Sequence, residues 1–289
     1  MEKVNFAVAD TYLVGDLYKV PSDKPQPAVA IIGPMTYQKE QAPTEYAQRL
    51  AEQGFVALAY DSRYRGESGG EIRAWENPEH KVEDLLAAVK YLQGRADVDS
   101  TQVSIVAICQ GSSEAVVAAA QIPELRGLVT IAGHYRDHEG DIEWLSEEGF
   151  QSRKSAGEKA SQKYLETGEV DYVKASDPVD MNVGMPGDFV YDWYGPWAER
   201  GLWENRYAVM SDASLLNFES MSSVPKIRSS WLMFHGDYCF LPSAAKRHAD
   251  AVSEQIDFEM IWSDTPHLAY YDQDDVIDAT VNRIVSSLG

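Results

Sequence analysis

Short apolar runs and amphipathic segments alternate along most of the chain. The continuous apolar runs are typical of strands buried on both faces of a sheet: Ala28–Ile32, Val56–Tyr60, Val103–Ile108, Leu128–Ala132 and Ser230–Phe234. Asn5–Ala9 and Tyr12–Val20 precede them and have the pattern of an antiparallel pair. The alternation predicts an α/β protein of the α/β-hydrolase type, with a mostly parallel central sheet and helices on both faces.

One helix is marked at both ends. Asn77 suits the N-cap, Pro78 the first helical position, and Gly94 can close the C-terminus. Apolar residues recur between them at helical spacing, namely Val82, Leu85, Leu86, Val89 and Leu92. One face of this helix is therefore expected to be buried.

The alternation stops over residues 134–225, a stretch rich in charged and aromatic residues. A structureless loop of that length is improbable in a compact domain. We therefore predict a helical cap at 134–225, inserted into a core domain formed by 1–133 and 226–289. Trp193 and Trp197 are candidate substrate-binding residues that would wall an acyl pocket, although tryptophans at helical spacing are more often core residues.

Composition and charge limit the classes of binding partner that can be expected. The chain has 289 residues, 44% of them hydrophobic, and a net charge of −21. Such a surface repels phosphate backbones and anionic headgroups, so neither nucleic acid nor a membrane is expected as a partner. No segment has the pattern of a signal peptide or of a bilayer span, which predicts a cytoplasmic protein with reduced thiols. A homodimer stays an open alternative.

The segment Val103–Ala115 carries the candidate chemistry. Its apolar strand ends at Ile108, Cys109 stands at the turn, and small residues open the next helix at Gly111. This is the strand–turn–helix context of a nucleophile elbow, in which the helix N-terminus favours a thiolate. The alternative is that Cys109 is a small buried hydrophobic residue at a strand end.

Two partners for Cys109 follow in the order nucleophile, acid, histidine that α/β-hydrolases have. Asp237 lies in a loop after the strand Trp231–Phe234, and His267 follows a later strand. Asp237 would orient His267, which would act as the general base. The alternatives are a turn-forming aspartate and an exposed loop histidine.

An oxyanion hole requires two N–H donors. Gln110, directly after Cys109, would supply one of them. The other is expected after the strand that ends at Ile32, from Met35 or Thr36, because Pro34 lacks an N–H. The histidines and two cysteines have no zinc spacing, so neither a metal nor an organic cofactor is expected.

These motifs resemble one branch of a known family. The pattern D-x-R-x-x-G-x-S-x-G at Asp61–Gly70, the cysteine elbow AICQGS, HGD before a proline, and TPHLAYYDQ are together similar to the dienelactone-hydrolase-like α/β-hydrolases. The resemblance spans nearly the whole chain. It implies a Cys-Asp-His site at Cys109, Asp237 and His267, with Asp61 and the arginines of its motif fixing a loop. It departs in having Ala107 at the first elbow glycine, a shifted acid and a longer cap.

The function that these residues predict is cleavage of a small ester, thioester or lactone through an acyl-cysteine intermediate. The branch includes fungal polyketide acyltransferases, so acyl transfer to an alcohol is an alternative on the same site. A non-catalytic ligand-binding protein on a hydrolase scaffold is the third hypothesis. The expected partner in each case is a small molecule.

Overall fold

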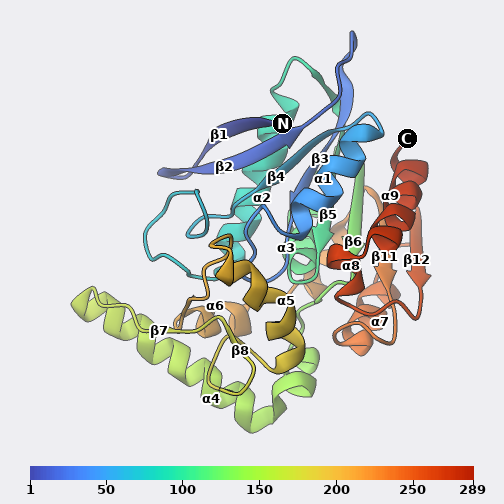
Figure 1. Ribbon diagram of the computed structural model, residues 1–289. Helices are drawn as coiled ribbons and strands as arrows, with labels where there is room; N and C mark the ends of the chain where they lie inside the picture. Colours follow the sequence, from blue (N-terminus) through green and yellow to red (C-terminus); the bar gives the residue numbers. More distant parts are fainter.

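An eight-stranded sheet runs through the computed structural model, which describes residues 1–289 (Figure 1). Its strands, in spatial order, are β1 (Glu2–Val8), β2 (Thr11–Tyr18), β4 (Val56–Tyr60), β3 (Gln26–Ile32), β5 (Val98–Ile108), β6 (Gly127–Ile131), β11 (Ser230–His235) and β12 (Phe258–Trp262). β2 is antiparallel to β1 and β4, and the remaining neighbours are parallel. This confirms the predicted sheet and its antiparallel opening pair.

Helices cover both faces of the sheet because its central strands are apolar on both sides. Alternate residues of β3 divide between two core clusters, with Ala28, Ala30 and Ile32 in one and Val29 and Ile31 in the other. The first cluster includes α2 (Pro78–Gln93), α3 (Gly111–Ala119) and α7 (Pro242–Asp250). The second includes α1 (Ala42–Glu52), α8 (Ala269–Asp272) and α9 (Asp274–Leu288).

Helix α2 has the ends that the sequence predicts. The Asn77 side chain accepts a hydrogen bond from the His80 N–H at 3.1 Å, Pro78 is the first helical residue, and Gly94 is the C-cap. Val82, Leu85, Val89 and Leu92 are all buried. The helix begins where Asn77 satisfies a free backbone donor.

Residues 134–225, for which a helical cap is predicted, are not purely helical. They contain α4 (His138–Thr167), α5 (Asp188–Glu199), α6 (Ser211–Asn217) and the 3-10 turn Met221–Lys226, and also the short strands β7 (Tyr172–Val173), β8 (Ser176–Asp177), β9 (Met185–Pro186) and β10 (Tyr207–Ala208). α4 and α5 gather at one end of the sheet (Figure 1). α4 has 30 residues and is broken at Ser146, where φ is 62°. No helix is long and apolar enough to cross a bilayer.

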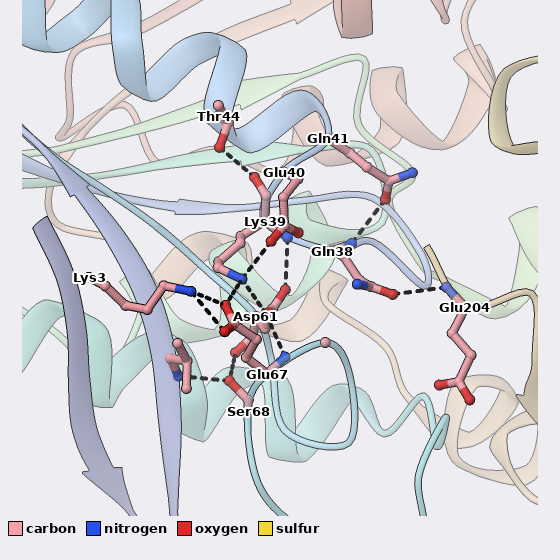
Figure 2. A network of polar contacts seen from close by, with 12 residues as sticks. Lys3, Gln38, Lys39, Glu40, Gln41, Thr44, Asp61, Glu67, Ser68 and Glu204 are labelled. Carbon is pink, nitrogen blue, oxygen red and sulfur yellow. Dashed lines mark hydrogen bonds and ion pairs between the residues drawn. The ribbon is translucent and has the colours of Figure 1, made fainter. Parts of the chain in front are cut away.

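The loop after β4 is held by buried charge, as its sequence predicts. Lys39 Nζ contacts Asp61 Oδ2 at 2.9 Å and Glu67 Oε2 at 2.7 Å, and both Lys39 and Asp61 are buried (Figure 2). Lys3 reaches Glu67 from β1, and the Ser68 hydroxyl donates to the Asp61 carbonyl at 2.6 Å. These residues fix the loop and lie outside the cavity that Cys109 lines.

Candidate active site

Cys109 occupies a strained turn between β5 and α3. Its φ is 52°, a left-handed conformation that is costly for a residue with a side chain. Its N–H donates to the Ile131 carbonyl at 3.0 Å and its carbonyl accepts from the His134 N–H at 2.9 Å, so β6 and the chain after it hold the turn. A side chain at Gly111 would come within 2.6 Å of the Gly33 carbonyl oxygen. Glycine thus lets α3 start directly below the Cys109 turn, as the elbow pattern predicts.

Three donors approach the sulfur of Cys109. The N–H groups of Gln110 and Met35 and the hydroxyl of Tyr271 lie near the sulfur, and each acts to lower the pKa of the thiol. Burial is the larger effect and raises the pKa of the Cys109 thiol above its usual value. The structure therefore brings Gln110 and Met35 to the nucleophile candidate, where an oxyanion hole would lie. Thr36 differs, because its N–H lies near the buried carboxylate of Glu76 and lowers the pKa of that group.

Two aromatic side chains of the insertion fix the loop that carries Met35. The Tyr194 hydroxyl donates to the Met35 carbonyl at 3.0 Å, and the Trp203 indole N–H donates to the Thr36 carbonyl at 2.8 Å. The cap thus holds the Met35–Thr36 peptide group, which is next to the peptide group that carries the Met35 N–H. Sequence analysis did not find these two residues, since nothing in their local pattern indicates a partner more than 150 positions away.

His267 makes two hydrogen bonds that define its protonation. Its Nδ1 accepts from the Phe240 N–H at 3.2 Å, and its Nε2 lies 3.0 Å from the Tyr271 hydroxyl. An N–H can only donate, so Nδ1 is unprotonated and the neutral ring carries its proton on Nε2. Burial, with a smaller contribution from His235, lowers the pKa of His267 to about 3. The ring is neutral and, in this geometry, Nε2 is a donor.

Tyr271 links the two reactive side chains, a role that sequence analysis missed. Its buried hydroxyl lies 3.0 Å from His267 Nε2 and is also near the Cys109 sulfur. The Nε2 proton is donated to the Tyr271 oxygen, which leaves the tyrosine proton free to point at the sulfur. Tyr271 follows His267 by four positions across the turn into α8. That spacing in TPHLAYYDQ is the one signal that could have indicated it.

Asp237 is not placed beside His267, contrary to the prediction. Its side chain is 62% exposed and its charged neighbour is Lys246, at 3.4 Å. No carboxylate is among the hydrogen-bond partners of His267. Two positions after Asp237, the Cys239 sulfur lies 3.8 Å from the Thr265 carbonyl oxygen. The Phe240 N–H, from the same loop, contacts His267 Nδ1, the atom that an orienting acid would contact.

Cys109 and His267 open into a largely apolar cavity of about 320 Å³. Residues 134–225 supply His134, Trp144, Met185, Pro186, Phe189, Val190 and Tyr194, and the core supplies Met35, Cys109, Tyr238, Cys239, Phe240, His267, Leu268 and Tyr271. Such a cavity suits an uncharged, mainly hydrocarbon group.

The two predicted pocket tryptophans do not line this cavity. The Trp193 indole N–H donates to Asp272 Oδ2 at 2.9 Å, and its ring packs edge-on against Tyr271 at 5.0 Å. Trp197 packs on Trp193 and, on its other side, on the Arg200 guanidinium. Trp193 therefore packs behind the residues that line the cavity, and Trp197 packs on Trp193. This agrees with the alternative that tryptophans at helical spacing are core residues.

A buried polar network lies below Gln110. The Gln110 amide donates to Glu114 Oε1 at 3.2 Å and its oxygen accepts from the Arg136 Nε at 2.9 Å. Arg136 in turn pairs with Asp141 at 2.8 Å, near the start of α4. Burial raises the pKa of Glu114 to about 7, and its Oε2 has no partner. The network fixes the residue that follows the nucleophile candidate and connects it to the cap. No group of three or more His, Cys, Asp or Glu side chains is arranged to hold a metal ion.

Comparison with known proteins agrees with this architecture. Residues 14–147 match the dienelactone hydrolase family. The protein YcjY of Escherichia coli (strain K12) is 43% identical over 94 residues, which are 32% of this chain and 31% of YcjY. The acyltransferase drtE of Aspergillus calidoustus is 29% identical over 132 residues, 45% of this chain and 42% of drtE. The chain thus aligns with less than half the length of each of these two relatives.

The likeness to solved structures extends over nearly the whole chain. The crystal structure of the α/β hydrolase GrgF from Penicillium sp. sh18 superposes with a TM-score of 0.83 at 20% identity, covering 99% of this chain and 97% of GrgF. The strand–turn–helix at Cys109 is the local structure of a nucleophile elbow in this fold. The chain has an α/β-hydrolase-like fold, and its residues 14–147 match the dienelactone hydrolase family.

Proposed function

We propose that this protein is an acyl-transfer enzyme that cleaves a small ester, thioester or lactone through an acyl-Cys109 intermediate. One observation carries the proposal: Cys109 occupies a strained turn at the wall of an apolar cavity, with the N–H groups of Gln110 and Met35 near its sulfur. A buried structural cysteine requires neither the strain nor the paired donors. Strain at a residue in contact with a cavity is a usual sign of function.

The reaction begins when the Cys109 thiolate attacks the carbonyl carbon of the substrate. The carbonyl π electrons move to the oxygen, which the N–H groups of Gln110 and Met35 stabilise as it becomes an oxyanion. The carbon–oxygen or carbon–sulfur bond to the leaving group then breaks, and the leaving group takes a proton. Water attacks the resulting thioester, releasing the acid and restoring the thiol.

His267 is the group proposed to move protons in both halves. To accept the thiol proton at Nε2, the ring must carry its other proton on Nδ1. The Phe240 N–H opposes that tautomer in the substrate-free structure. We therefore propose that substrate binding shifts the contact between Phe240 and His267, and that Tyr271 leaves Nε2 at the same time.

The cavity supports a substrate class. Its lining is mainly hydrocarbon and aromatic, and the net charge of the chain is −21. An anionic acyl group would therefore meet both a desolvation cost and a repulsive field. An uncharged, apolar acyl part in the cavity, with the leaving group towards the exposed Tyr238, fits best.

Acyl transfer to an alcohol is a second candidate on the same site. It is favoured by the similarity to drtE, an acyltransferase by name, and by the apolar wall, which limits water at the thioester. Adding increasing concentrations of simple alcohols during turnover separates the two functions. A hydrolase gives mostly acid, and a transferase gives mostly the new ester.

The test of the proposal is ester turnover by matched cysteine variants. Cys109→Ala should abolish release of p-nitrophenol from p-nitrophenyl butyrate and hexanoate. Cys239→Ala removes the other thiol of the same cavity and should retain turnover. Equal activity of Cys109→Ala and the wild type would refute the proposal.

A further inference from the structure

His134 is a buried residue of the cavity wall, and the Nε2 atom of its ring has no hydrogen-bond partner. It is 5% exposed, and its Nε2 is fully buried without a donor or acceptor nearby. The other buried polar groups of the lining are occupied: Tyr194 by the Met35 carbonyl, Tyr271 by His267, and Cys239 by the Thr265 carbonyl. A buried polar group without a partner costs free energy, so it indicates a missing partner.

The His134 ring is held in place by its surroundings. The backbone N–H of His134 donates to the Cys109 carbonyl at 2.9 Å, and the backbone carbonyl of His134 accepts from the Ser113 hydroxyl at 2.7 Å. The ring packs edge-to-face on Trp144 of the cap, at 5.9 Å, and on Phe240 of the core, at 4.8 Å. A ring that is fixed between cap and core and anchored to the nucleophile turn can position a ligand group relative to Cys109.

The chemistry of the ring limits the ligand. Burial, with the nearby Arg136 next in importance, holds the pKa of His134 well below its usual value. The neutral ring offers one N–H donor and one lone pair, which suit a hydroxyl or carbonyl oxygen and give no attraction to an anion. The remaining lining is mostly apolar, so this ring distinguishes an oxygen-bearing chain from a plain hydrocarbon chain.

We propose that His134 determines substrate specificity by hydrogen bonding to an uncharged oxygen substituent on the acyl chain, so that the preferred substrates are oxoacyl or hydroxyacyl compounds. This inference rests on the proposed acyl transfer through Cys109. A site that hydrogen-bonds a substrate oxygen discriminates against the analogue without it, because the site group is then left unpaired.

The test compares p-nitrophenyl heptanoate with its 4-oxo, 5-oxo and 6-oxo derivatives. The wild type should prefer at least one oxo ester in kcat/KM by about tenfold, the usual scale of one net hydrogen bond. His134→Phe keeps an aromatic ring between Trp144 and Phe240 but removes both nitrogens, and it should bring that ratio close to one. His138→Phe is the matched control, because His138 is exposed and does not line the cavity, and it should keep the wild-type ratio.

Binding separates failure of this inference from failure of the proposed function. Heptanamide and the oxoheptanamides lack a good leaving group, and calorimetry should show the same oxygen preference in wild type and its loss in His134→Phe. If no ester acylates Cys109 while the amides show the preference, the proposed function fails and the role of His134 stands. If His134→Phe does not fold, His134→Gln, which keeps a donor and an acceptor, should retain part of the preference. Equal wild-type affinity for all the amides, or an unchanged preference in His134→Phe, overturns the inference.

Discussion

The chemistry of the site depends on three side chains whose protonation is set by burial. Burial raises the pKa of Cys109 and Tyr271 and lowers that of His267 to about 3, so each is neutral in the substrate-free protein. Cysteine enzymes that rest as a thiolate–imidazolium pair have a strongly lowered thiol pKa. In this site the sulfur is a neutral thiol with hydrogen-bond donors near it. We therefore expect the thiolate to form only when the substrate binds.

Alkylation of Cys109 should therefore depend steeply on pH. A thiol with a raised pKa ionises more fully as the pH rises, so the iodoacetamide rate should increase about tenfold per pH unit from pH 7 to 9, without a plateau. The rate is measured by mass spectrometry in the Cys239→Ala background, which leaves a single thiol. A rate that is already constant at pH 7 would mean that an ion pair with His267 exists in the free enzyme.

Asp237 and His267 should differ sharply in their effect on turnover. Asp237 contacts only Lys246 at the surface, so Asp237→Asn should change kcat/KM by less than about threefold. His267→Gln removes the proposed general base and should lower kcat/KM by about 10²- to 10⁴-fold. Ester hydrolysis at pH 8 measures both. A loss in Asp237→Asn as large as that in His267→Gln would mean that the loop brings the carboxylate to the ring during turnover.

At the scale of helices and strands, the sequence predicts those features that depend on a short run of neighbouring residues. The apolar strand, the small residues and Gly111 were sufficient to locate the Cys109 turn, and Asn77 and Gly94 bounded α2. The arrangement around His267 could not be predicted in the same way. Which group reaches its Nδ1 depends on how the loop from His235 to Leu241 folds against another loop, a tertiary contact without a periodic signal. The cap aromatics were ambiguous for the same reason.

Helix α3 contains a buried carboxyl that should make stability depend on pH. Burial raises the pKa of Glu114 from 4.5 to about 7, so the folded state binds a proton that the unfolded state releases between these values. Its contribution to stability is full below about pH 4.5 and is lost as the pH rises through about 7. Glu114→Gln does not titrate, so from pH 5 to 8 it should become more stable relative to wild type, by about 3 kcal/mol at most.

Urea unfolding at a series of pH values measures this difference, and titrations elsewhere in the molecule cancel in it because both proteins share them. A difference between Glu114→Gln and wild type that stays constant from pH 5 to 8 would contradict a titrating carboxyl at this position.

At the scale of the whole molecule, cap and core form one site. Tyr194 and Trp203 of the cap hold the loop that carries Met35, while Arg65 of the core donates to the Glu204 carbonyl at 3.0 Å and the Arg206 carbonyl at 2.8 Å. The cap therefore orients the proposed oxyanion hole as well as lining the cavity.

The buried ion pair of Figure 2 should be important for the stability of the whole domain. Asp61→Asn leaves the Lys39 ammonium buried with one fewer counter-charge, and it should lower the free energy of unfolding by about 3 kcal/mol. Lys3→Gln removes the exposed pair with Glu67 in the same network and should cost less than about 1 kcal/mol. Urea denaturation measures both. Equal small losses would contradict the structural role of the buried pair.

The most direct test of the account is to trap the acyl group on the protein. Wild-type protein is mixed with p-nitrophenyl hexanoate, quenched in acid within one turnover, and analysed by intact mass and by sequencing of its peptides. The account predicts one added hexanoyl group, located on the peptide that contains Cys109, and none in Cys109→Ala. Turnover without any adduct on Cys109, or an adduct on another residue that persists in Cys109→Ala, would contradict it.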